Sequence, residues 1–319
     1  MFKVAIAGVG GISKSHIAAW LKIPNAKITA LCDVRPEQMK GPQEQTGATT
    51  YVSFDEMLER EQIDILDICL PTDLHADYAI KAIEKGINVL IEKPISLKYE
   101  DVERVYSAAE KHGVKVMVAQ VLSFWRDYLY LKELVDKRIY GRVLSGSMER
   151  IGTTPGWSFE NWMTDESRSG LVPFDLHIHD LDFLIYTFGE PKGSRKYRAR
   201  GENQDYIHVV YEYDDFFVSA DSAWFNKDVP FQSGYRFQFE DALVIFKEKR
   251  LKVIPKDGES FFVTGDTGAA DSGINLPATN AFLNEIEYFV SCVAEDKPTT
   301  EKVKKEELQI VLKTLLDFN

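Results

Sequence analysis

The feature that most constrains the fold of this chain is an alternation of short apolar segments with amphipathic ones over residues 1–121. The first apolar segment, Lys3–Ala7, is followed by a glycine-rich loop and then by an amphipathic stretch, Ser15–Leu21. Alternating units of this kind predict a parallel sheet with helices on both faces. Further predicted strands span 26–31, 49–52, 63–70, 87–91 and 114–120, and further predicted helices span 54–60, 74–85 and 99–112.

The loop after the first strand is typical of a dinucleotide-binding fold. Gly8, Gly10 and Gly11 allow a tight turn and the close approach of a pyrophosphate, whose charge would lie at a helix N-terminus. Ile12 and Ser13 complete the loop, and Ser13 takes the third glycine position of G-x-G-x-x-G, where a small residue still permits close packing of helix on sheet. The loop alone is weak evidence, because glycine turns between strand and helix are common.

An acidic residue follows the second predicted strand. Asp33 lies about twenty residues past the loop, where a ribose-binding acid is expected. A carboxylate there accepts hydrogen bonds from ribose hydroxyls and repels a 2′-phosphate, which favours NAD. Arg35 leaves NADP possible, because its side chain could contact a phosphate or stack on adenine. The alternative is that Asp33 caps a helix beginning at Pro36.

The predicted strand 87–91 ends on Glu92-Lys93-Pro94, two opposite charges and a proline that cannot continue the ladder. Open α/β sheets bind ligands outside the carboxyl ends of their strands, so Lys93 is a candidate for chemistry. The competing interpretation is that Glu92 and Lys93 are ordinary solvated loop residues.

Pro71, Thr72 and His75 follow the predicted strand 63–70 and should lie beside Lys93 at the same edge of the sheet. We count them among the candidate cofactor contacts. For His75, a structural role on the first turn of a helix is the alternative.

The pattern changes after Gly141. Long, alternating, aromatic-rich segments predict a large, mainly antiparallel open sheet. With 319 residues, the chain exceeds what one core usually covers. We therefore predict a dinucleotide-binding domain over 1–121 and a substrate-binding and oligomerisation domain over 122–319, with amphipathic helices near the C-terminus that could pack back on the first domain. The predicted strands are 143–151, 197–201, 206–213, 216–224 and 235–246, and the predicted helices are 124–137, 281–294 and 305–318.

The segment from Gly170 to Asp182 interrupts this sheet pattern. Asp175, His179 and Asp182 share one face at helical spacing. A carboxylate one turn from an imidazole can orient it and tune its basicity, which is useful for taking a proton from an alcohol. An Asp-rich helix start favoured by the macrodipole is the alternative. His177 and His179 should point in different directions, so we predict no metal site.

Two polar loops, 152–159 and 256–280, carry many hydrogen-bonding groups. Trp157 in the first loop and Trp162 just after it could place aromatic faces against the C–H surface of a polyol. A solvated hairpin is an equally good interpretation of the second loop.

Charge and cysteine usage exclude several function classes. A net charge of −12 repels nucleic acid phosphates and anionic membranes, so we expect a small-molecule substrate. We expect neither a membrane span, because apolar runs are too short, nor a signal peptide in Met1–Ala7. Cys32, Cys69 and Cys292 form no CxxC pair and are expected to be buried free thiols in a reducing cytoplasm.

Taken in order, the glycine loop, Asp33, Pro71-Thr72-Asp73-Leu74-His75, the Glu92-Lys93-Pro94 tripeptide and the segment Asp175–Asp182 resemble the Gfo/Idh/MocA oxidoreductases over essentially the whole chain. In similar enzymes the lysine of the tripeptide lies near the nicotinamide and hydrogen-bonds the reacting hydroxyl, and the peptide before the proline is often cis. The resemblance implies Lys93, Asp175 and His179 as the catalytic set, and the same three with Trp157 and Trp162 as substrate contacts. Glu92 is counted with the cofactor contacts because it belongs to the tripeptide.

The resemblance also implies a function and a partner. It implies an NAD(P)-dependent dehydrogenase for a secondary alcohol of a cyclic polyol or sugar, similar to the inositol dehydrogenase-like branch. It further implies a homodimer or homotetramer through the open sheet. A non-catalytic NAD-binding sugar sensor and an NAD-dependent glycosidase of the same family are the alternatives.

Overall fold

The computed structural model describes residues 1–264 and 279–318. Their contacts divide the chain into two compact units. The first comprises Met1–Val121 together with 280–309, and the second comprises 122–264 together with 310–318.

The first unit is built on a six-stranded parallel sheet of order β3-β2-β1-β4-β5-β6. The order reverses between β1 and β4, and open α/β sheets bind ligands outside the carboxyl ends of their strands at such a point. The predicted parallel sheet is confirmed. Its strands are β1 Phe2–Ala7, β2 Ala26–Cys32, β3 Thr49–Tyr51, β4 Ile65–Ile68, β5 Asn88–Glu92 and β6 Val116–Ala119.

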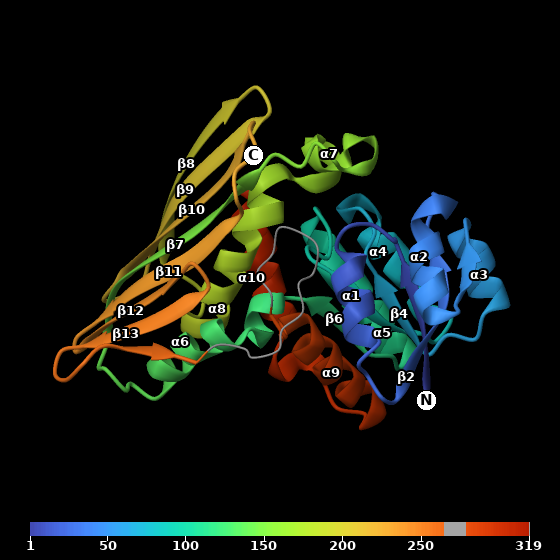
Figure 1. Cartoon of the computed structure of the whole chain (residues 1–319), viewed down its shortest axis with the longest axis horizontal. Coiled ribbons are helices and arrows are strands. Elements are labelled where there is room, and N and C mark those ends of the chain that lie inside the picture. Colours follow the sequence, from blue (N-terminus) through green and yellow to red (C-terminus); the bar gives the residue numbers. More distant parts are fainter. Residues whose placement is uncertain (265–278, 319) are drawn as a thin grey trace. The chain divides into compact units, whose positions relative to one another are not determined.

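Helices flank this sheet (Figure 1). One of them, α2, was missed, because Gly41 and Pro42 argue against a helix, although Pro36 at its first position and Gly47 after its end are ordinary boundary signals. The C-terminal α9 packs against α1, where the Phe282 ring lies 5.6 Å from the His16 ring. The helices are α1 Ser13–Trp20, α2 Pro36–Thr46, α3 Phe54–Arg60, α4 His75–Ile83, α5 Tyr99–His112 and α9 Ala281–Ala294.

The second unit contains an eight-stranded sheet of order β14-β13-β12-β11-β7-β10-β9-β8. All neighbours are antiparallel except β7 and β10, so the mainly antiparallel open sheet is confirmed. The strands are β7 Val143–Thr153, β8 Gly193–Gly201, β9 Gln204–Glu212, β10 Phe217–Phe225, β11 Gln232–Phe239, β12 Ala242–Lys247, β13 Arg250–Pro255 and β14 Phe261–Val263.

One sequence expectation for this sheet was wrong. The predicted single strand 235–246 is a hairpin in which Tyr235 pairs with Phe246, because Glu240 and Asp241 form a polar turn within one continuous alternation. For the segment 256–280, the hairpin interpretation agrees with the described residues, because β13 and β14 are antiparallel neighbours, and residues 265–278 lie outside the described part of the chain.

The two faces of the eight-stranded sheet differ. Helices α6 and α8 cover one face, where Tyr235, Phe237 and Phe246 are buried (Figure 1). The strand register places five exposed aromatic side chains on the opposite face: Tyr197, Tyr206, Phe217, Phe225 and Phe262. The helices of the second unit are α6 Arg126–Asp136, α7 Glu166–Ser169, α8 Ile178–Phe188 and the larger part of α10 Lys305–Leu316, which begins in the first unit.

The three cysteines are free and buried, as expected. Within 1–264 and 279–318, the helices are too short or too polar to span a bilayer.

Candidate active site

The glycine loop is shaped by close backbone approach at the end of β1. Gly8 has φ of +90°, and a Cβ there would lie 2.4 Å from the carbonyl oxygen of Cys69, so no larger residue fits without a shift. The Ser13 hydroxyl donates to the Gly10 carbonyl oxygen over 2.9 Å. Helix α1 then begins with no side-chain cap and no acidic residue in its first turn, so no negative side chain competes with an anion at this helix N-terminus. The loop therefore fits a dinucleotide pyrophosphate.

Asp33 follows β2 and is buried at the same sheet edge. Its carboxylate accepts a hydrogen bond from the Val9 backbone N–H over 2.8 Å, which ties it to the glycine loop. Two further bonds of 3.0 Å come from the Arg35 guanidinium. Asp33 thus lies at the sheet edge with a cation directly against it, and its contact with a ribose stays a prediction.

Pro71 and Thr72 follow β4, where a short 3₁₀ turn, Thr72–Leu74, leads into α4. His75 is buried, and its two ring nitrogens each lie 2.7 Å from a backbone carbonyl oxygen, that of Pro94 and that of Leu70. Burial lowers the pKa of His75, while both carbonyls act in the opposite direction. His75 therefore holds the turn after β5 to the turn after β4, and a direct contact with the cofactor stays a prediction.

Lys93 lies half-buried immediately after β5. The Glu92 carboxylate accepts a hydrogen bond from the Lys93 backbone N–H over 3.0 Å. The Lys93–Pro94 peptide is cis, as the resemblance implies. The role of the Lys93 ammonium in the reaction stays a prediction.

Sequence reasoning missed a buried polar cluster that joins α1 to β4 and to the end of β5. The His16 ring on α1 lies between two carboxylates, with 2.9 Å from Nδ1 to Asp67 Oδ2 and 2.9 Å from Nε2 to Glu92 Oε1. The Trp20 indole donates to the same Asp67 oxygen over 2.7 Å. The sequence signal for this cluster was Asp67, a single acidic residue inside the otherwise apolar strand β4.

His16, Asp67 and Cys69 each offer a possible metal-ligand atom within 4.8 Å of the others. The donor chemistry does not favour a metal there. Burial raises the pKa of Cys69 to about 12, so its thiol stays protonated at neutral pH. The Asp67 oxygen and both His16 nitrogens already have hydrogen-bond partners, which makes a hydrogen-bonded network the better description.

In the second unit, Asp175 lies on a π-helical turn, Pro173–His177, that leads directly into α8. Asp175 and His179 are half-buried, whereas the residues around them, Phe174, Leu176, Ile178 and Asp180, are buried. Both side chains therefore lie on the accessible side of this segment. Asp182, expected on the same face, is buried. Single π-helical turns inside helices often mark functional sites.

His177 faces the sheet instead. Its Nε2 lies 2.6 Å from the Tyr211 hydroxyl on β9, and its Nδ1 lies 3.3 Å from the Ser222 hydroxyl on β10. Burial, with help from the positive charges of Lys196 and Arg150, lowers the pKa of His177 to about 3. His177 and His179 thus differ in surroundings, as expected, and His177 is neutral.

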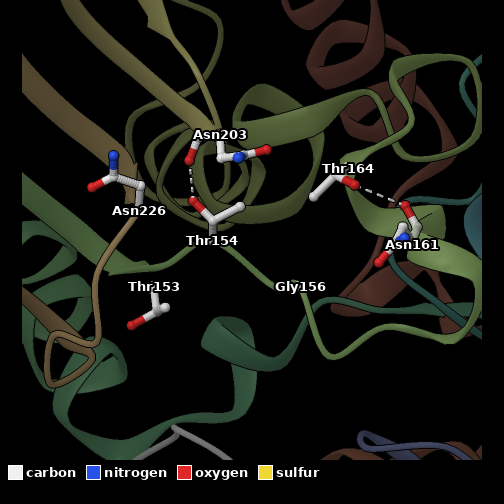
Figure 2. Close-up of a pocket in the computed structure, with 7 residues that line it drawn as sticks. All are labelled: Thr153, Thr154, Gly156, Asn161, Thr164, Asn203 and Asn226. Carbon is white, nitrogen blue, oxygen red and sulfur yellow. Dashed lines mark hydrogen bonds between the residues drawn. The ribbon is translucent and has the colours of Figure 1, made fainter.

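A polar pocket of about 360 Å³ lies in the second unit where β7 ends (Figure 2). Thr154 donates through its hydroxyl to the Asn203 carbonyl oxygen over 2.5 Å, and Thr164 to that of Asn161 over 3.0 Å. The pocket is lined by neutral residues: Thr153, Thr154, Gly156, Asn161, Thr164, Asn203 and Asn226. Trp157, next to Gly156, is 68% exposed, and Trp162 is half-buried.

Two family models match the chain. Residues 2–120 match the oxidoreductase family with an NAD-binding Rossmann fold, and residues 128–246 match the GFO/IDH/MocA C-terminal domain. The chain belongs to the Gfo/Idh/MocA family. The family assignment agrees with the glycine loop, the cis Lys93–Pro94 peptide and the two sheets described above.

Relatives within this family carry different activities in their names. The 2,7-anhydro-N-acetylneuraminate hydratase of Mediterraneibacter gnavus is 29% identical over 58% of this chain and 49% of its own length. The myo-inositol 2-dehydrogenase of Thermotoga maritima is 28% identical over 59% of this chain and 55% of its own. The chain spans about half the length of the curated relatives it matches.

The whole fold also matches solved structures. An oxidoreductase from Agrobacterium radiobacter, solved with NAD+, L-tartaric acid and magnesium, superposes with a TM-score of 0.83, covering 99% of this chain and 94% of the other at 16% identity. At this identity the likeness establishes the fold.

Proposed function

We propose that this chain is an NAD(P)-dependent dehydrogenase that oxidises a secondary alcohol of a cyclic polyol or sugar, in a reversible reaction. The observation that carries the proposal is Lys93, a half-buried lysine fixed by Glu92 at the carboxyl edge of a dinucleotide-type sheet. A cation in that place can stabilise negative charge on a substrate oxygen.

In the proposed reaction, Lys93, Asp175 and His179 act on one substrate hydroxyl. A bound nicotinamide supplies the hydride acceptor. Lys93 donates a hydrogen bond to the alcohol oxygen and stabilises the negative charge that develops on it. His179 takes the hydroxyl proton, and Asp175, four residues earlier on the same accessible side, orients the imidazole.

For the cofactor, we propose binding by the first unit with NAD preferred and NADP possible. The uncapped start of α1 would take the pyrophosphate, and Asp33 would take the adenosine ribose. Arg35, which already neutralises Asp33, would lower the penalty for a 2′-phosphate. The proposed contacts are Gly8, Gly10, Gly11, Ile12, Ser13, Asp33, Arg35, Pro71, Thr72, His75, Glu92 and Lys93.

For the substrate, a hydroxyl-rich ring suits the second unit. The neutral pocket at the end of β7 offers amide and hydroxyl groups, which pair well with sugar hydroxyls (Figure 2). The exposed face of Trp157 could pack on a sugar ring, and Trp162 lies in the same region of the chain. The inositol dehydrogenase among the relatives supports a cyclic polyol.

We further propose self-association through the open face of the eight-stranded sheet. Five exposed aromatic side chains on one sheet face form an apolar surface of the kind that marks protein interfaces.

We propose that residues 1–121 bind the cofactor and that residues 122–319 bind the substrate and a second copy of this chain. Helix α9 belongs to the second of these segments but packs in the first unit. Three buried free thiols suit a cytoplasmic location. Sedimentation of the wild type and of a Phe217→Glu variant tests the interface, and a smaller species is expected for the variant.

The deciding experiment for the activity is a panel of inositols and sugars incubated with NAD+ or NADP+, with formation of reduced nicotinamide followed by absorbance. Net reduction with at least one cyclic polyol or sugar is expected. Turnover of a glycoside, or of another sugar, with bound cofactor but without net reduction would favour the glycosidase alternative or a hydratase like the relative named above. Ligand binding without turnover would favour the sensor.

A further inference from the structure

The number of protons bound by the buried triad Asp67–His16–Glu92 in the first unit follows from its geometry. Both ring nitrogens of His16 lie 2.9 Å from carboxylate oxygens. A neutral imidazole has a single N–H and a carboxylate has none, so two short contacts of this kind require two bridging protons. The triad therefore has a net charge of −1, with His16 as an imidazolium between two carboxylates.

The surroundings of His16 favour its protonated form. Burial acts to lower the pKa of His16, but attraction and hydrogen bonding from Asp67 outweigh it, and the pKa lies well above the ordinary value. The side chains of His16 and Asp67 are fully buried and that of Glu92 is 9% exposed. Asp67 Oδ2 also accepts from the Trp20 indole, so its position is set by two donors from α1.

The triad links helix α1 to the backbone segment that carries Lys93. His16 lies on the first turn of α1, whose uncapped start follows the glycine loop. Its other partner, Glu92, uses its second oxygen to accept the backbone N–H of Lys93 over 3.0 Å. The peptide plane from which the Lys93 side chain departs is therefore set through Glu92 by His16, and His16 is set by Asp67.

We infer that His16 and Asp67 are positioning residues for Lys93. The triad fixes the Glu92–Lys93 peptide relative to helix α1, the proposed pyrophosphate-binding helix. The Lys93 ammonium therefore keeps a constant position relative to the start of that helix. The inference rests on the role of Lys93 in the proposed function. It gives Glu92 a structural task, to carry the link, in addition to the cofactor contact proposed for it.

The test uses a variant that should fold. His16→Phe alone leaves two buried carboxylates, Asp67 and Glu92, without their cation, which is costly. The double variant His16→Phe/Asp67→Asn removes the charge of the more deeply buried one, Asp67, and the side-chain amide oxygen that it introduces can still accept from the Trp20 indole. Thr299→Val is the matched control, because it removes a buried 2.8 Å hydrogen bond to the Val116 carbonyl in the same unit without touching the triad. Asp67→Asn alone is the conservative variant, since a neutral His16 can still donate to Glu92.

The first readout is a kinetic cycle with Lys93→Met. In the Lys93 background, the double variant should lower kcat by about tenfold to a hundredfold, the scale expected for a misplaced catalytic group, with a smaller change in KM for the cofactor. In the Lys93→Met background, it should produce no further loss, and Asp67→Asn alone should retain most of the activity. An equal loss in both backgrounds would reduce the triad to a general stability role and overturn the inference.

The second readout does not depend on turnover. Hydrogen exchange of the Lys93 amide should be faster in the double variant than in the wild type or in Thr299→Val, while β4 and β6 keep their protection. Wild-type exchange at Lys93 in the folded double variant would overturn the inference. If the wild type reduces no cofactor with any substrate, the proposed function fails, and the exchange result still decides whether the triad holds Lys93.

Discussion

The Arg35 guanidinium and the Asp33 carboxylate are joined by two hydrogen bonds of 3.0 Å at the carboxyl end of β2. In the proposed cofactor site, the pair would offer a cation to a 2′-phosphate of NADP and an acceptor to a ribose hydroxyl. Discrimination between the two cofactors is therefore expected to depend on both residues.

Replacing Arg35 by Ala should shift cofactor preference toward NAD. A charged hydrogen bond contributes about 1.5–3 kcal/mol, so the ratio of kcat/KM for NADP+ to that for NAD+ should fall by roughly tenfold to a hundredfold. Asp33→Ser, which keeps Arg35, should move the ratio in the opposite direction. Steady-state kinetics with both cofactors measure this, and a ratio unchanged in Arg35→Ala would remove Arg35 from cofactor recognition.

Replacing His179 by Asn should slow alcohol oxidation strongly and affect cofactor affinity little. Loss of a general base costs about a hundredfold to ten-thousandfold in rate. His112→Asn is the control, because His112 is exposed at the end of α5. Stopped-flow or steady-state rates with NAD+ and the best substrate measure the effect. Equal rates for the His179→Asn and His112→Asn variants would exclude His179 as the base.

The second unit should lose stability on mild acidification because of His177. Burial lowers the pKa of His177 from 6.5 to about 3. Between these two pH values the His177 side chain is protonated in the unfolded chain and neutral in the folded chain. The stability is fully present above about pH 6.5 and falls as the pH drops toward 3, with a maximal slope of about 1.36 kcal/mol per pH unit from this group. Urea unfolding of wild type and His177→Phe across this range tests it, and the variant should show the weaker pH dependence. The same slope in both proteins would contradict the assignment.

The close approach at Gly8 predicts a large cost for a single methyl group. In Gly8→Ala the new Cβ meets the Cys69 carbonyl at 2.4 Å, and φ is +90°. Gly86→Ala is the matched control, since φ is +78° there and no atom lies within 4 Å of the new Cβ. Both variants carry backbone strain of more than about 1 kcal/mol, and only Gly8→Ala adds the clash. Thermal melting should therefore show a clearly lower Tm for Gly8→Ala, and equal Tm values would count against the tight turn.

Local patterns were enough to predict the parallel sheet and the glycine loop, because the signals lie next to each other in sequence. Gly8 to Ser13 follow an apolar strand and precede a helix, and the structure has all three elements in that order. The cis Lys93–Pro94 peptide followed from the family resemblance. The helical spacing of Asp175 and His179 was also visible, although the π-helical turn that carries Asp175 was not.

The buried triad could not be predicted for a topological reason. His16 lies 51 residues from Asp67 and 76 from Glu92 in the sequence, and the strand order β1-β4-β5 is what brings the three together. From sequence alone, Glu92 looked like a charged loop residue with no task. The hairpin at Glu240 was missed because the alternation of buried and exposed residues continues on both sides of the turn.

The central claim is that Lys93 is the cation that stabilises the reacting oxygen, and Lys93→Met tests it most directly. The turnover of this variant should fall by about a hundredfold to a thousandfold, the cost of losing one preorganised donor, while the Kd for NADH measured by fluorescence stays close to the wild-type value. Wild-type turnover in Lys93→Met would contradict the claim.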